Sequence, residues 1–106
     1  MTFLELDRIL KDTGRIGYAT SMLACLLDAF DRGETILEKE TVASLIDITD
    51  TNVSAVAKRL AESGVIEILY CDKRADKPTY STIPNGRWAT PYYQLTSKVL
   101  KAYRRA

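Results

Sequence analysis

The stretch TVASLIDITDTNVSAVAKRLAESGVI, residues 41–66, contains the patterns of two short helices separated by a polar turn. Apolar residues recur at helical spacing over residues 51–63, and Gly64 follows as a helix-ending residue. The preceding pattern, over residues 38–46, carries acidic side chains in its first turn, where the helix dipole favours anions. Residues 47–50, DITD, join the two patterns, so this stretch predicts a helix, a tight turn and a second helix.

The second of these helices has two chemically different faces. Counting about 100° per residue places four apolar side chains in one stripe, which we expect to be buried: Val53, Val56, Ala57 and Leu60. The opposite face carries small, polar and charged side chains: Thr51, Asn52, Ser54, Ala55, Lys58, Arg59 and Glu62. We expect this face to meet either solvent or a ligand, and solvent is the simpler interpretation.

Two strand patterns follow the second helix. Residues 65–70 and 91–96 are rich in β-branched and aromatic side chains, which is typical of strands. Between them, residues 71–90 contain Pro, Asn and Gly turn formers, so they predict a long hairpin or an irregular excursion. We expect Trp88, Tyr92 and Tyr93 to pack the hairpin against the core rather than to form a stacking platform for single-stranded nucleic acid.

Three further helices are predicted outside this region. Residues 2–11 form a short amphipathic pattern, and residues 97–105 form a basic helical pattern. A central helix ends near Gly33, and its expected buried residues are Tyr18, Met22, Cys25, Leu26, Ala29 and Phe30. The length of 106 residues fits one domain spanning the whole chain, since domains usually have about 100 to 200 residues.

The predicted fold class is therefore mostly α (α+β). It comprises a helix-turn-helix over about residues 38–63, a two-stranded hairpin over about residues 65–96, and extra terminal helices at residues 2–11 and 97–105. This order of elements is typical of a winged helix-turn-helix, in which the second helix of the motif enters the major groove of DNA.

The composition excludes several other classes of protein. With 46% hydrophobic and 27% charged residues, the chain is close to the globular average. No apolar run approaches the roughly 18 residues of a membrane helix. The first ten residues include Glu5, Asp7 and Arg8, which is unlike a secretory signal. We therefore expect a soluble cytoplasmic protein that makes no membrane contact.

The residues needed for most metal sites and activated nucleophiles are also missing, which leaves enzymes that use carboxylates or lysine only formally possible. The chain has no histidine and two cysteines, Cys25 and Cys71, whereas a closed zinc site takes four nitrogen or sulfur ligands. A histidine-activated nucleophile is excluded for the same reason, and the five glycines form no phosphate-binding pattern. We expect no catalytic residues, no metal and no cofactor, hence no enzyme. Cys25 is expected in the core and Cys71 at a strand end, where a disulfide between protomers stays open.

The formal net charge of +1 conceals an asymmetry along the chain. Residues 1–40 contain five Lys or Arg and eight Asp or Glu, a net charge of −3. Residues 41–106 contain ten and six, a net charge of +4. This sign favours a polyanion as the partner of the C-terminal two thirds.

Residues 41–66 strongly resemble the winged helix-turn-helix of MarR-like and ArsR-like bacterial transcription regulators, and the resemblance covers roughly residues 36–96. Within the helix-turn-helix, Ala43 matches the small residue at the packing position of the first helix, Ile48 the apolar turn residue, and Val53 and Leu60 the buried positions of the second helix. The end of the second helix and the residues after it also match the family: Arg59, Leu60, Gly64, Val65 and Ile66. Tyr93, Leu95 and Thr96 match the Y-x-L-T that ends the second wing strand. Asp50 and Ala55 depart from the family's more basic second helix, and residues 71–90 are longer than a simple wing.

The resemblance implies sequence-specific binding of double-stranded DNA, most simply by a transcriptional repressor. The residues expected to contact DNA are Thr49, Thr51, Asn52, Ser54, Ala55, Lys58 and Arg59 on the helix-turn-helix, and Lys73, Arg74, Lys77 and Arg87 on the wing. The wing cations would reach phosphates or the minor groove, where the potential is negative. The sequence names neither an operator nor a small-molecule effector.

We expect a homodimer, because a single module of this size covers little DNA. The terminal helices would form the interface, since they carry apolar residues that need a partner surface: Phe3, Leu4, Val99, Leu100 and Tyr103. Two other functions stay open. One is a plasmid or viral replication or partition module that binds DNA through the same fold. The other is a winged helix used for protein contact, which the low net charge and the acidic Asp50 and Glu62 favour.

Overall fold

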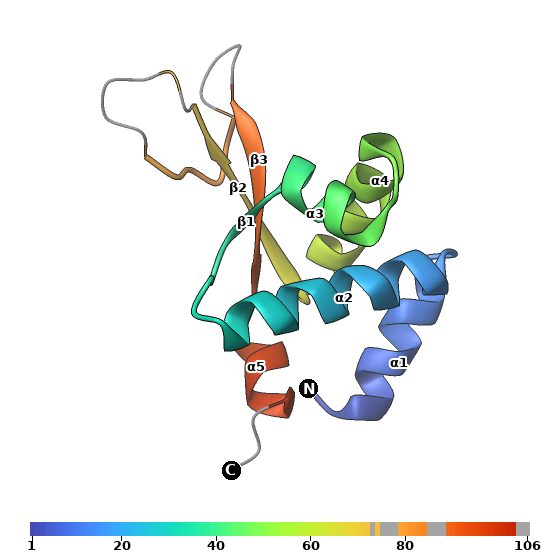
Figure 1. Ribbon diagram of the computed structural model, residues 1–106. Helices are drawn as coiled ribbons and strands as arrows, with labels where there is room; N and C mark the ends of the chain where they lie inside the picture. Colours follow the sequence, from blue (N-terminus) through green and yellow to red (C-terminus); the bar gives the residue numbers. More distant parts are fainter. Residues whose placement is uncertain (73, 75–78, 85–88, 104–106) are drawn as a thin grey trace.

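The computed structural model describes residues 1–72, 74, 79–84 and 89–103, which form an α+β fold (Figure 1). In chain order the elements are α1 (Phe3–Asp12), α2 (Ile16–Asp31), β1 (Leu37–Glu38), α3 (Lys39–Ile46), α4 (Asp50–Glu62), β2 (Ile66–Cys71), β3 (Thr90–Leu95) and α5 (Ser97–Tyr103). The predicted α+β class is confirmed. Within the described residues, no helix has both the length and the apolar character needed to cross a membrane.

The sheet is antiparallel and has the strand order β1-β3-β2. The two predicted strands, β2 and β3, pair along their whole length. The prediction of only two strands is incomplete, because Leu37 and Glu38 pair with Tyr93 and Tyr92 as a third strand. Two residues are too few to show an alternating pattern, so the sequence gives no signal for β1. Because Glu38 belongs to β1, the helix expected from residue 38 begins at Lys39.

Helices α1 and α2 lie where they are predicted, with small shifts at their ends. The Thr2 side chain accepts a hydrogen bond from the Glu5 N–H at 3.1 Å, so Thr2 caps α1 instead of belonging to it. The predicted buried face of α2 is partly wrong: Tyr18 is exposed, while Cys25 and Phe30 are half-buried. The buried residues are Ala19, Met22, Leu23, Leu26 and Ala29. Because α2 is apolar around much of its circumference, periodicity alone does not select the buried face.

A turn of three residues joins α3 to α4. Asp47 adopts a left-handed backbone (φ 54°, ψ 50°), and the N–H groups of Asp47 and Ile48 both donate to the Ala43 carbonyl, which ends α3. The Ile48 side chain packs against the core. The Thr49 hydroxyl then accepts a hydrogen bond from the Asn52 N–H at 3.3 Å and caps α4. The turn thus ends one helix and begins the next within three residues, which fixes the direction of α4.

Helix α4 buries the stripe predicted for it against α2, α3 and β2. Its four apolar residues Val53, Val56, Ala57 and Leu60 are all at most 2% exposed. Gly64, with φ 78°, lets the chain turn out of the helix, and the Val65 N–H donates to the Leu60 carbonyl at 2.9 Å. This ending places Val65, which is fully buried, at the start of the path into β2.

The C-terminal helix α5 packs onto the core of its own chain. Val99 is 1% exposed and Leu100 is partly buried against the core. The expectation that Val99 and Leu100 need a second protomer to bury them is therefore wrong, because the rest of the chain covers them. Phe3 and Leu4 at the other terminus remain exposed. The end of the predicted helix, residues 104–105, lies outside the described residues.

The left-handed backbone of Asp47 yields a stability prediction. We expect Asp47→Val to lower the free energy of unfolding by about 1 to 2 kcal/mol, because a β-branched side chain is strained in this conformation. Asp47→Gly is the matched control and should be close to the parent, since glycine adopts the conformation without strain. Urea denaturation measures both. Equal stability of the two variants would contradict the role of this turn.

Candidate nucleic-acid interface

The outward face of α4 is exposed, as its helical spacing predicts. The exposed residues of this face include Thr51, Ser54, Ala55, Lys58 and Arg59. Figure 1 shows α4 at the upper right, the β2–β3 hairpin extending beyond the helices at the upper left, and α3 between them. Because the opposite stripe of α4 is buried, these side chains protrude together from one side of the molecule.

Two predicted contact residues already have partners within the chain. The Thr49 hydroxyl caps α4. The half-buried Asn52 uses its side-chain Oδ1 to accept a hydrogen bond from Nη1 of Arg15, in the connection between α1 and α2. This contact joins residues 37 positions apart, so no local sequence pattern predicts it. Arg15 is therefore a candidate interface residue that the sequence reasoning missed.

Tyr93 of β3 connects the sheet to α4. Its side chain is 2% exposed, and burial raises its pKa to about 12 because the phenolate loses hydration. A side-chain hydrogen bond with Ser54 acts in the opposite direction. Ser54, predicted only as a DNA contact, thus also links α4 to the hairpin strand. Tyr93 packs against the core as expected, Tyr92 is half-buried, and Trp88 lies outside the described residues.

The end of α4 is also tied to the end of the hairpin. The Thr96 hydroxyl donates to the Gly64 carbonyl at 2.7 Å, and the Thr96 N–H donates to the Val65 carbonyl at 3.1 Å. The Thr96 carbonyl in turn accepts a hydrogen bond from the Leu100 N–H in α5. The hydrogen bonds of Thr96 therefore connect the end of α4 to β3 and α5, which helps to hold α4 in a fixed position.

The structure describes only one of the four predicted wing cations. Arg74 is exposed, and its backbone N–H donates to Oδ1 of Asp72 at 2.9 Å. Lys73, Lys77 and Arg87 lie outside the described residues, so their contribution to DNA binding stays a prediction.

Part of the excursion between β2 and β3 returns to the sheet. Tyr70 and Ser81 form an isolated bridge, in which each N–H donates to the other residue's carbonyl, at 2.7 and 2.9 Å. The rings of Tyr80 and Tyr92 meet edge to face at 5.2 Å between centroids. The excursion is therefore held against the base of the hairpin at this point.

The formal charges of α4 cancel. Asp50 and Glu62 oppose Lys58 and Arg59, and all four side chains are exposed. Affinity for a nucleic acid comes largely from cations that neutralise phosphates. A nucleic acid bound at α4 would therefore need cations from neighbouring elements, and Arg15 is placed against α4 by its hydrogen bond.

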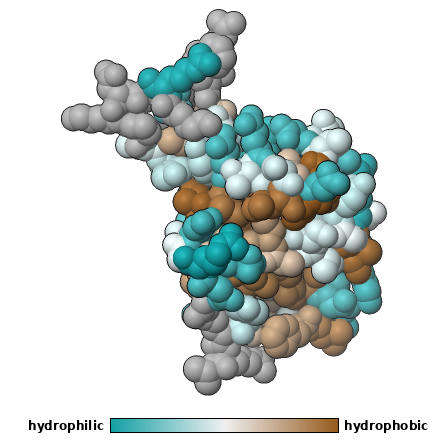
Figure 2. All heavy atoms as spheres, viewed as in Figure 1, coloured by the Kyte–Doolittle hydropathy of each residue, from teal (hydrophilic) through white to brown (hydrophobic). Residues whose placement is uncertain are grey.

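An open groove lies between α2 and α3 (Figure 2). Its volume is about 470 Å³, and it is lined by Ser21, Ala24, Cys25, Asp28, Arg32, Leu45 and Ile46. Figure 2 shows hydrophobic residues gathered between these two helices, and Leu45 is 59% exposed. Burial raises the pKa of the Cys25 thiol, although the Arg32 guanidinium acts in the opposite direction. The thiol is therefore mainly protonated at neutral pH, which gives it no reactive character.

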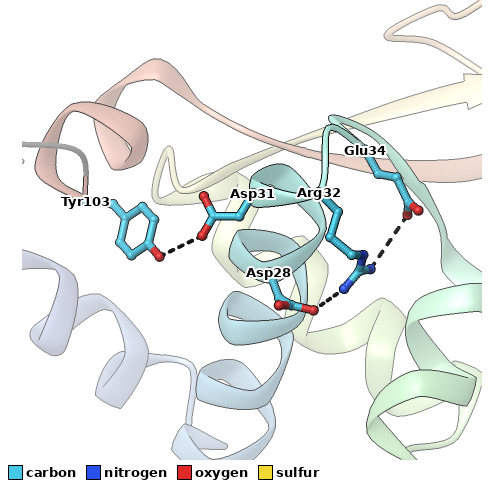
Figure 3. Close-up of polar contacts among 5 residues, drawn as sticks. All are labelled: Asp28, Asp31, Arg32, Glu34 and Tyr103. Carbon is cyan, nitrogen blue, oxygen red and sulfur yellow. Dashed lines mark hydrogen bonds and ion pairs between the residues drawn. The ribbon is translucent and has the colours of Figure 1, made fainter.

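The charged groups at the C-terminal end of α2 neutralise one another (Figure 3). The Arg32 guanidinium pairs with the carboxylates of Asp28 and Glu34. The Tyr103 hydroxyl donates to Oδ2 of Asp31 at 3.0 Å, which ties α5 to α2. Exposed pairs of this kind contribute little stability. They do show that Arg32 is held by carboxylates, whereas Arg15 has no such partner among the described residues.

Within the described residues, no group of three or more His, Cys, Asp or Glu side chains is arranged to hold a metal ion. Cys71 is buried, so its thiol is not presented to a second protomer. The chain matches no protein-family model, no curated protein and no solved structure.

The burial of Tyr93 predicts a stability change at high pH. Its pKa in the folded chain is about 12, above the ordinary value of 10, so the folded state keeps the phenol proton up to a higher pH than the unfolded state does. The free energy of unfolding should therefore fall between about pH 10 and pH 12, by about 2 to 3 kcal/mol from this residue. Denaturant titrations across this range, with Tyr93→Phe as the comparison, measure the effect. An equally steep decline in Tyr93→Phe would contradict it.

Proposed function

We propose that this chain is a winged helix-turn-helix protein that binds double-stranded DNA, with α4 as its recognition helix. The observation that carries the proposal is the exposed face of Thr51, Ser54, Ala55 and Lys58 on a helix whose other face is buried. A recognition helix needs this arrangement, because its side chains must reach base edges while its scaffold stays fixed.

The connection between the two helices supports the same proposal. In helix-turn-helix motifs, a turn of three to four residues, often with a glycine, joins the two helices. Here Asp47 supplies the left-handed backbone that a glycine often provides. The β2–β3 hairpin follows α4 directly and extends beyond the helices, as a wing would.

The side chains of α4 suit contact with a groove. Ser54 and Ala55 are small enough to let the helix approach closely. The longer Lys58 and Arg59 can donate hydrogen bonds to guanine or to phosphates. Arg74 at the hairpin would add a phosphate contact that carries no sequence information. We further propose that the protein regulates transcription, most simply as a repressor in the cytoplasm.

Selection of bound sequences from a random pool of duplex DNA tests the proposal. We expect enrichment of a defined motif. Failure of the parent protein to retain any duplex at low salt would overturn the proposal.

Substitution of the central cation of α4 tests which face is used. On the enriched duplex, Lys58→Ala should weaken binding by about 1 to 3 kcal/mol if Lys58 contacts a base. Arg32→Ala is the control, because this exposed cation lies at the C-terminal end of α2 and is paired with Asp28 and Glu34, and it should bind as the parent does. Gel-shift titration measures both variants. Equal binding by Lys58→Ala and the parent would show that α4 does not read the DNA.

We propose that the functional unit is a homodimer in which α1 contributes the apolar contact. Phe3 and Leu4 are 57% and 61% exposed, whereas Val99 and Leu100 are covered by their own chain. Tyr103, on α5, is also partly exposed beside Asp31. The expected interface thus narrows to the start of α1 together with the outer side of α5.

Sedimentation at micromolar concentration tests the dimer. We expect the parent to sediment as a dimer and Leu4→Glu to sediment as a monomer, because a buried charge without a partner is unfavourable. Leu45→Glu, which changes an equally exposed leucine on α3, should remain dimeric. A monomeric parent would contradict the proposed dimer and leave DNA binding to be judged separately.

Protein contact is the second candidate function. The specific observation in its favour is the partly apolar groove between α2 and α3, together with the cancelled charges of α4. Salt separates the two functions, because a complex that neutralises phosphates weakens steeply as salt rises and an apolar contact does not.

A further inference from the structure

We propose that Arg15 is a phosphate-binding residue of the DNA interface and that Asn52 is the residue that positions it. This inference rests on the proposed DNA binding. It assigns the two residues different roles from those expected from the sequence, in which Asn52 contacts DNA directly and Arg15 has no function.

The backbone at Arg15 is held by a short series of hydrogen bonds. The Thr13 hydroxyl donates to the Leu10 carbonyl at 2.7 Å and accepts a hydrogen bond from the Arg15 N–H at 3.2 Å. Gly14, with φ 75°, allows the tight reversal between α1 and α2. Arg15 then lies at the N-cap of α2. The side chain of Arg15 thus starts from a defined position.

The far end of the side chain is fixed by α4. Nη1 of Arg15 donates to Oδ1 of Asn52, and the Asn52 N–H donates to the Thr49 hydroxyl in the first turn of α4. Figure 1 shows the connection between α1 and α2 on the same side of the molecule as α4. A guanidinium has five N–H donors in a planar fork, so four remain after the contact with Asn52. Arg15 is exposed, which leaves these donors accessible to a phosphate.

Charge supplies the second part of the argument. Helix α4 has no net charge, and Asp50 in its first turn repels phosphates. Within the described residues, no ion pair holds Arg15, whereas Arg32 is paired with Asp28 and Glu34. Asn52 is neutral, so it orients the guanidinium without cancelling its charge. A bidentate contact from an oriented guanidinium is well suited to a phosphate beside the first turn of α4.

The test measures binding to a fluorescein-labelled mixed-sequence duplex by fluorescence anisotropy over a series of salt concentrations. For Arg15→Gln we expect weaker binding and a slope of log affinity against log salt that is smaller by about 0.9, the value for one phosphate contact. Arg32→Gln is the matched control, because it removes the same charge from a paired site, and its slope should equal that of the parent. Arg15→Lys should keep the parent slope, since the charge is retained.

Asn52→Ala separates positioning from charge. This variant keeps the charge of Arg15 and removes the hydrogen bond that orients its guanidinium, so affinity should fall while the salt slope changes less than in Arg15→Gln. Circular dichroism of each variant checks that the fold is retained.

Two negative results have different meanings. If the parent binds the duplex and Arg15→Gln shows the same slope as Arg32→Gln, the role of Arg15 is overturned while DNA binding stands. If the parent does not bind the duplex at any salt concentration, the proposed function itself is overturned, and the role of Arg15 with it.

Discussion

The burial of one stripe of α4 is the constraint on which the rest of the structure depends. Four apolar side chains from Val53 to Leu60 leave water together, and α2, α3 and β2 pack around them. This burial is the main favourable term that holds the helix in place. The opposite side of α4 points away from this core and its side chains are exposed, which gives the face to which we assign function.

The two ends of α4 make its orientation specific. At its start, Thr49 and the left-handed Asp47 fix the turn from α3. At its end, Gly64 and Thr96 connect it to β2, β3 and α5. The Ser54–Tyr93 contact adds a polar link to the sheet. A reading surface needs this kind of support, since side chains on a loosely held helix cannot hold a fixed position against base edges.

The positive charges that could attract a polyanion lie on several elements of this protein. Helix α4 carries equal numbers of acidic and basic residues, and the two described cations that we propose to act with it, Arg15 and Arg74, lie outside this helix. Attraction to a polyanion would therefore depend on how the α1–α2 connection and the hairpin are placed around α4. The groove between α2 and α3 is a separate surface, lined by both apolar and charged side chains.

The five helical segments, the strands β2 and β3, and the buried and exposed faces of α4 can be predicted from the amino-acid sequence, because they follow from local periodicity and from turn-forming residues. The sequence does not predict β1, which is too short to carry a pattern, or the buried face of α2, which is apolar on several sides. The burial of Val99 and Leu100 in their own chain, and the contact of Asn52 with Arg15 across 37 residues, are seen only in the folded structure. Contacts of that kind depend on how whole elements pack together, and the spacing of residues along one helix or strand contains no information about them.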